Sequence, residues 1–233
     1  MKVYFIPGLG ANCKCFKHIK LPDGFEKVYI EWFTPKGTET IEEYTHKMAE
    51  KIDTTEPFIL VGYSFGGIIV QEMNKFMNPE KTILIASMKN DIQTPQLFKI
   101  LKRIKFTHWF PMTFFTSKKF LSYAFLRSVY FKMRPPRIKD KEDLKIEEYM
   151  TQMNPQYLKW SINQIINWKS EKECKNIYQI HGTKDIIFPY KKISIKTKKD
   201  DMQDNLYTID KASHILVLEY PHKINKAFEK ILL

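Results

Sequence analysis

Cysteine is scarce in this chain of 233 residues, and long apolar runs are missing. The three cysteines, Cys13, Cys15 and Cys174, are too few for a disulfide framework, so we expect a reducing compartment. Cys13 and Cys15 lack a second Cys or His pair at ligand spacing, and no metal or other cofactor is expected. No apolar stretch approaches the roughly 18 residues of a membrane span, and the opening MKVYFIPGLG lacks the features of a signal peptide. The sequence therefore predicts a cytoplasmic protein.

Acidic residues are missing from one long segment. Residues 92–139 contain eleven Lys or Arg and no Asp or Glu, whereas the remainder of the chain holds 27 bases and 26 acids. Almost the whole net charge of +12 therefore belongs to this segment. No recognised nucleic-acid-binding fold or basic recognition helix accompanies the charge, so nucleic acid is not an expected partner.

Short apolar runs alternate with helical patterns along most of the chain. Apolar residues at helical spacing follow Thr38, Ser64 and Pro221. After Ser64 the predicted buried stripe consists of Ile69, Met73 and Phe76, and Pro79 ends that helix. Strands that alternate with helices imply a parallel sheet with right-handed crossovers. Six runs bounded by Gly, Pro or Asp are the predicted strands: Val3–Ile6, Lys27–Glu31, Phe58–Gly62, Thr82–Ala86, Asn176–Ile180 and Asn205–Ile209.

The alternation stops between the fourth and fifth of these strands. There the sequence carries only helical stripes, formed by Leu97, Ile100, Leu101 and Ile104, by Leu121, Phe125 and Val129, and by Tyr157, Trp160, Ile165 and Trp168. We therefore predict one α/β core made of residues 1–91 and 171–233, with residues 92–170 inserted as a helical cap.

Glycine is also scarce, and it is unevenly distributed. Three of the eight glycines lie in the segment GYSFGG at positions 62–67, around Ser64. A predicted buried strand leads into this segment and a helical pattern follows it, which is the context of a nucleophile elbow. In such a turn the serine Oγ is exposed, and the helix N-terminus directs its N–H groups toward a developing oxyanion. This context favours Ser64 as a nucleophile over a purely structural turn.

A serine hydroxyl needs a base that takes its proton, and the chain has six histidines. His18, His46 and His108 lie early or within helical patterns, His181 ends a strand, and His222 begins the last helix. His214 lies in a loop after the last predicted strand, at the same edge of the sheet as Ser64. We therefore predict His214 as the base.

The imidazole in turn needs a carboxylate that fixes its tautomer. Asp185 follows the penultimate strand in the segment HGTKD, again at the carboxyl edge of the sheet. Two rivals remain: Asp91, after the preceding strand, and Asp210, four residues before His214. Asp185 is the preferred prediction.

Two N–H donors are needed to hold an oxyanion. Phe65 directly follows the predicted nucleophile and supplies one. The segment IPGLG after the first strand is suited to supply the other through the N–H of Leu9, because its glycines allow a close backbone approach. An ordinary glycine turn is the alternative for this segment, and a phosphate-binding loop is disfavoured because no G-x-G-x-x-G or P-loop pattern is present.

Taken together, IPGLG, GYSFGG, HGTKD and ASHIL resemble the α/β-hydrolase family, in particular small bacterial serine hydrolases with a helical cap. The resemblance covers nearly the whole chain outside residues 92–170, and it implies Ser64, Asp185 and His214 as a catalytic triad with Leu9 and Phe65 as oxyanion donors. Many members carry His-Gly where this chain has Pro7-Gly8. The first predicted strand corresponds to the family's third, so the resemblance implies a mainly parallel sheet of six strands flanked by helices.

The family's cap covers the nucleophile and shapes the substrate pocket. Here residues 92–139 combine the basic excess with eleven aromatic residues, and Phe110 and Phe114 are candidates for contact with substrate. We expect hydrolysis of carboxylic esters or thioesters with a hydrophobic acyl group. A dehalogenase is disfavoured because its chemistry would need a carboxylate at position 64. Acyl transfer, peptide cleavage, a carbon–carbon lyase reaction and a non-catalytic binding module are the alternatives. The basic residues predict either a solvated outer face or contact with an anionic membrane or an acidic carrier.

Overall fold

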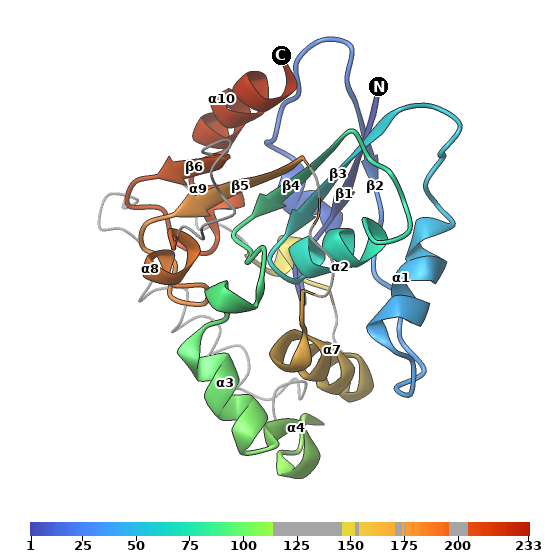
Figure 1. Cartoon of the computed structure of the whole chain (residues 1–233), viewed down its shortest axis with the longest axis vertical. Helices are drawn as coiled ribbons and strands as arrows, with labels where there is room; N and C mark the ends of the chain where they lie inside the picture. The colour runs from blue at the N-terminus through green and yellow to red at the C-terminus, as the bar shows by residue number, and fades with distance from the viewer. Residues whose placement is uncertain (114–145, 152–153, 171–173, 175, 196–204) are drawn as a thin grey trace.

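A computed structural model describes residues 1–113, 146–151, 154–170, 174, 176–195 and 205–233 (Figure 1). In these residues the structure forms one sheet of six strands in the order β2-β1-β3-β4-β5-β6, and every neighbouring pair is parallel. The predicted α/β class and the six-stranded parallel sheet are therefore confirmed. The strands are β1 (Lys2–Ile6), β2 (Glu26–Tyr29), β3 (Phe58–Tyr63), β4 (Lys81–Ile85), β5 (Ile177–Gly182) and β6 (Leu206–Ile209).

The strand limits differ from the prediction by a residue or two, and backbone conformation explains two of the differences. Ala86 and Asn176 were both expected inside strands. Their φ angles of 48° and 51° are incompatible with a strand. β4 therefore ends at Ile85, and β5 begins at Ile177.

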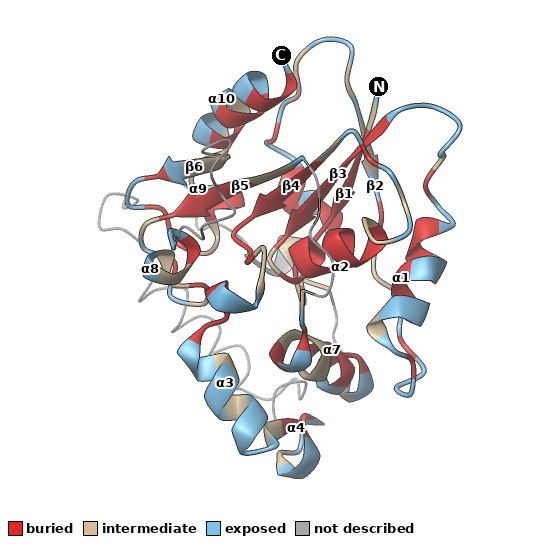
Figure 2. Cartoon of the chain, viewed as in Figure 1, coloured by how far each residue is buried: buried red, intermediate tan, exposed pale blue. Residues whose placement is uncertain are grey.

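Both faces of the sheet are covered, which explains why the central strands are apolar nearly throughout. All six residues of β3 are buried, and the central strands β1, β3 and β4 form the buried centre of the molecule (Figure 2). Along β1, Val3 and Phe5 belong to one apolar cluster with α10 (Pro221–Leu232), the short helix α9 (Leu216–Glu219) and the 3-10 helix η1 (Cys13–Phe16).

The opposite face of the sheet is covered by a second set of helices. Tyr4 and Ile6 of β1 pack there with α1 (Ile41–Ala49), α2 (Phe65–Met73) and α7 (Pro155–Asn167). α1 follows Thr38, as predicted, and its N-cap is Thr40, whose Oγ1 accepts a hydrogen bond from the Glu43 N–H at 3.1 Å. Because α2 follows β3 directly, its first turn lies at the carboxyl edge of the sheet.

The prediction that Phe76 belongs to the buried stripe of the helix after Ser64 is wrong. α2 ends at Met73, and Phe76 is 39% exposed in the turn beyond it. Its ring stacks on His46 of α1 at 3.7 Å between centroids. Apolar spacing alone misplaced the helix end, because Phe76 finds its partner on another helix.

Between β4 and β5 the described elements are helical, as predicted: η2 (Asp91–Gln93), α3 (Gln96–Arg103), α4 (Phe106–Trp109), η3 (Ile146–Tyr149) and α7. α8 (Tyr190–Ile193) follows β5. The predicted stripe at Leu121, Phe125 and Val129 lies outside the described residues, and the division into core and cap stays a prediction. α3 does not bury the stripe expected of it, since Leu97 and Ile100 are exposed. It packs instead through Phe98, whose ring meets Phe188 edge-on at 5.5 Å.

Candidate active site

Ser64 lies in the sharp turn between β3 and α2. Its φ of 53° and ψ of −117° are a strained conformation for a residue with a side chain. The turn is held by hydrogen bonds on both sides: the Ser64 N–H donates to Ile85 O at 2.9 Å, and Ser64 O accepts from the Gly67 N–H at 2.9 Å. The neighbouring glycine is required sterically, because a Cβ on Gly62 would lie 2.3 Å from the carbonyl oxygen of Gly66. The predicted elbow is therefore present.

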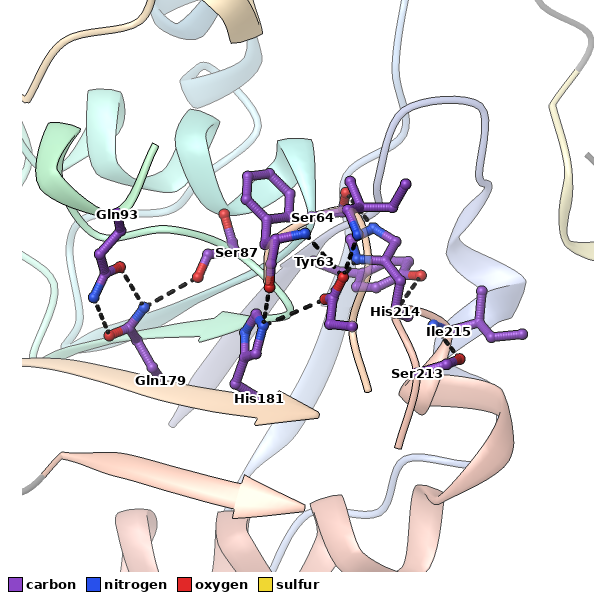
Figure 3. Close-up of polar contacts among 12 residues, drawn as sticks. Tyr63, Ser64, Ser87, Gln93, Gln179, His181, Ser213, His214 and Ile215 are labelled. Carbon is purple, nitrogen blue, oxygen red and sulfur yellow. Dashed lines mark hydrogen bonds and ion pairs between the residues drawn. The ribbon is translucent and has the colours of Figure 1, made fainter. Parts of the chain in front are cut away.

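A chain of hydrogen bonds links Ser64 to residues that are far away in the sequence. Nε2 of His214 lies 2.9 Å from Oγ of Ser64, and Nδ1 of His214 lies 2.8 Å from Oδ2 of Asp185 (Figure 3). His214 comes from the loop between β6 and α9, and Asp185 comes from the loop after β5. All three loops leave the carboxyl ends of parallel strands, so the topology brings them to one edge.

Both oxygens of the Asp185 carboxylate have hydrogen-bond partners within the protein. Its Oδ1 accepts hydrogen bonds from the N–H groups of Ile187 and Phe188 at 2.8 and 2.9 Å, and its Oδ2 faces His214. Burial alone would raise the pKa of Asp185, but the charge and hydrogen bond of His214 and the backbone N–H groups together lower it. The carboxylate is therefore ionised, and it orients the imidazole.

His181 is a site residue that the sequence analysis passed over. Its buried ring lies with Nε2 2.8 Å from the carbonyl oxygen of Phe188 and 3.4 Å from Oδ2 of Asp185. A carbonyl oxygen only accepts hydrogen bonds, so Nε2 carries the proton. Burial lowers the pKa of His181, which keeps the ring neutral. Oδ2 of Asp185 therefore faces two imidazoles, and the only sequence signal was a histidine four residues before the aspartate.

The loop after β1 lies against the Ser64 turn. A Cβ on Gly8 would lie 3.0 Å from Cβ of Ser64, and a Cβ on Gly66 would lie 2.3 Å from the carbonyl oxygen of Ile6. The structure thus places the two predicted donor positions, Leu9 and Phe65, on the segments that meet at Ser64. Phe65 is the first residue of α2, so its N–H is not used within the helix.

The rival carboxylates make other contacts. Asp91 accepts a hydrogen bond from the Ser170 N–H at 2.5 Å, and Asp210 accepts one from Oγ1 of Thr183 at 3.1 Å. Of the two cap candidates, Phe110 is half-buried and stacks on Phe106 at 4.8 Å, and Phe114 lies outside the described residues. The substrate-contact role of both therefore stays a prediction.

Solved structures with the same architecture identify the fold. A bromoperoxidase from Bacillus anthracis is 17% identical with a TM-score of 0.61, and the match covers 99% of this chain and 91% of that chain. An epoxide hydrolase from Bacillus megaterium is 14% identical, with a TM-score of 0.69 and coverage of 99% and 93%. A lipase-esterase related protein from Clostridium acetobutylicum is 15% identical, with a TM-score of 0.63 and the same coverage of 99% and 93%. The chain has the α/β-hydrolase fold. No family model and no curated protein sequence matches it.

Within this α/β-hydrolase fold, the described residues contain no group of three or more His, Cys, Asp or Glu side chains arranged to hold a metal ion. In the same residues, none of the helices combines the length and the apolar character needed to cross a membrane.

Proposed function

We propose that this protein is a serine hydrolase that cleaves carboxylic esters or thioesters through an acyl-enzyme. The observation that carries the proposal is the continuous contact from Ser64 Oγ through His214 to the buried Asp185, with distances of 2.9 and 2.8 Å. An alcohol, an imidazole and a carboxylate in this order form the proton path that activates a serine.

In the proposed acylation step, Ser64 Oγ attacks the carbonyl carbon while His214 Nε2 takes the hydroxyl proton. The carbonyl oxygen becomes an oxyanion that accepts hydrogen bonds from the N–H groups of Leu9 and Phe65. His214 then gives its proton to the departing alcohol or thiol as the tetrahedral intermediate collapses. A water molecule repeats the sequence on the acyl-enzyme and restores Ser64. Loss of one oxyanion donor typically costs about 3 to 4 kcal/mol of transition-state stabilisation.

The fold does not select the reaction, because the similar structures are named as a bromoperoxidase, an epoxide hydrolase and a lipase-esterase related protein. The choice of acyl chemistry rests on the residue at the elbow. A serine hydroxyl forms an ester with an acyl group, and the following N–H groups suit the oxyanion of a carbonyl substrate. Acyl transfer and peptide cleavage with the same residues are the alternatives, together with a non-catalytic binding module.

A panel of p-nitrophenyl and CoA esters of increasing acyl length tests the proposal. We expect turnover of both leaving groups or of one, with kcat/KM rising by up to about fourfold for each methylene that enters the pocket, which corresponds to about 0.8 kcal/mol. Phe110 is the aromatic residue that we expect to contact the acyl chain of the substrate. Folded protein that hydrolyses no ester on the panel would favour the binding module, and a flat profile across chain lengths would exclude a hydrophobic acyl pocket.

We further propose that the basic segment of residues 92–139 contacts an anionic membrane through α3 and α4. Leu97 and Ile100 on α3 are 55% and 49% exposed, and Trp109 on α4 is 63% exposed. The exposed bases Lys102 and Arg103 lie on the same helix as the two aliphatic residues. Apolar side chains beside bases on a helix are suited to the surface of a bilayer with anionic lipids.

Co-sedimentation with vesicles tests this contact. Wild-type protein should bind phosphatidylglycerol vesicles at low salt and stay in the supernatant with phosphatidylcholine vesicles. Reversing the charges with Lys102→Glu and Arg103→Glu should weaken binding by at least about 30-fold, since each base near the surface contributes about 1 kcal/mol. Lys226→Glu with Lys230→Glu is the matched control, because α10 lies at the opposite end of the molecule (Figure 1). Equal recovery in the supernatant with both lipids would exclude the contact.

A further inference from the structure

Trp32 lies in the segment after β2 and contacts Phe65 and Gly8, whose carbonyl shares a peptide group with the Leu9 N–H. Its indole Nε1–H donates a hydrogen bond to the carbonyl oxygen of Gly8 at 3.1 Å. Its ring stacks on the ring of Phe65, with 5.1 Å between centroids and 7° between the planes. The side chain is half-buried, and a third aromatic residue, Tyr157 of α7, meets it edge-on at 5.9 Å.

The hydrogen bond from Trp32 acts on one particular peptide group. The Gly8 carbonyl and the Leu9 N–H belong to the same peptide, which is planar and trans, so the two groups point in opposite directions. Fixing the carbonyl therefore fixes the direction in which the Leu9 N–H points. The Gly8 oxygen also accepts the Ala11 N–H at 3.0 Å, and donation to a carbonyl polarises the N–H of the same peptide.

The stacked ring acts on the second donor. Phe65 is fully buried, and its backbone N–H begins α2 directly after Ser64. The nearly parallel stack fixes the Phe65 side chain against the segment that carries Trp32. One side chain thus links the loop after β1 to the start of α2, at the two positions where the oxyanion donors are expected.

We propose that Trp32 is a positioning residue that holds the Leu9 and Phe65 N–H groups in the orientation in which both donate to the oxyanion. The proposal rests on the serine hydrolase function proposed above. It differs from a purely structural role in a measurable way. A structural tryptophan needs its ring, whereas a residue that orients the Leu9 peptide also needs its N–H.

The test is Trp32→Phe, which keeps an aromatic ring against Phe65 and removes the indole N–H. We expect kcat for a p-nitrophenyl ester to fall about tenfold with KM changed by less than about twofold, since a weakened oxyanion contact acts on the transition state. The affinity for a trifluoromethyl ketone, which forms an oxyanion on the serine, should fall about tenfold in parallel.

The matched control is Trp160→Phe. The ring of Trp160 also contacts Phe65, edge-on at 6.2 Å, but its indole N–H donates to the carbonyl of Glu39 at 2.8 Å and not to that of Gly8. The control should leave kcat and ketone affinity within about twofold of wild type. If Trp32→Phe does not fold, the isosteric benzothienylalanine at position 32 removes the same N–H and should give the same tenfold losses.

Three results separate this role from the hydrolase function itself. Active wild-type protein whose Trp32→Phe variant keeps both kcat and ketone affinity would overturn the role of Trp32 and leave the hydrolase function standing. A variant in which only KM rises would also overturn the role of Trp32, because it would have lost binding that the substrate and the transition state share. Wild-type protein that neither turns over esters nor binds the ketone would overturn the hydrolase function, and the role of Trp32 with it.

Discussion

Ser64→Ala is expected to lower kcat for the best ester by about 10⁶-fold and to abolish labelling by a fluorophosphonate. The loss is large because Oγ forms the covalent bond of the acyl-enzyme, and no neighbouring group replaces it. His214→Ala should cost about the same, and the double variant should be no worse than either single one, since the two residues act as a unit. The measurements are steady-state hydrolysis and mass spectrometry of the labelled peptide.

A second serine provides the control for this experiment. Ser87 is buried near the elbow, since a Cβ on Gly67 would lie 2.5 Å from its Oγ. Its hydroxyl has no hydrogen-bond partner among the described residues. Ser87→Ala should therefore keep full labelling and nearly full activity. A label found on any serine other than Ser64, or labelling that survives His214→Ala unchanged, would contradict the proposed nucleophile.

The elements that the sequence predicted best are those whose signal is local. The strand, turn and helix around Ser64 follow one another within a few residues, and the glycines there are required by contacts inside that unit, as with Gly62 against Gly66. The parallel sheet was predictable for a related reason. Apolar runs separated by helical patterns allow few topologies, and right-handed crossovers bring the carboxyl ends to one edge. The loops that carry Ser64, Asp185 and His214 meet as a consequence of that arrangement.

Contacts between distant segments were not predictable. Trp32 and Gly8 are 24 residues apart, and nothing in either segment indicates that an indole N–H meets that carbonyl. His181 was judged by its place at the end of a strand, but its ring depends on Phe188, which is brought back by the loop after β5. Phe76 was misplaced in the same way, because its partner His46 lies on another helix. Periodicity describes which face of an element is apolar, and it does not identify the neighbour.

The choice among three aspartates shows how tertiary contacts supply what spacing leaves open. Asp91 and Asp210 both follow strands, as Asp185 does, so the sequence favoured Asp185 but left the other two as rivals. In the structure Asp185 lies against Nδ1 of His214 and receives two backbone N–H groups on its other oxygen. Asp210 accepts instead from Thr183. The hydrogen bonds of each carboxylate therefore favour Asp185 as the partner of the imidazole.

Asp185→Asn should lower kcat/KM by about 10⁴-fold while the protein stays folded. The amide oxygen will take the position that accepts from Ile187 and Phe188, because only an acceptor suits two N–H donors. The amide NH₂ then faces Nδ1 of His214, which must become an acceptor. The proton moves to Nε2, and the ring loses the lone pair that takes the proton of Ser64.

His181 makes this substitution harder to accommodate. Its Nε2–H lies 3.4 Å from the same carboxylate oxygen, so the new NH₂ would face a second donor there. Rotation of the amide would relieve that conflict only by placing the NH₂ against the N–H groups of Ile187 and Phe188. Asp210→Asn is the matched control, and it should keep activity within a few-fold of wild type, since Asp210 contacts Thr183 and not the imidazole. Hydrolysis and the rate of fluorophosphonate labelling should fall together in Asp185→Asn. A loss below about tenfold there, or a larger loss in Asp210→Asn, would show that a different carboxylate serves His214.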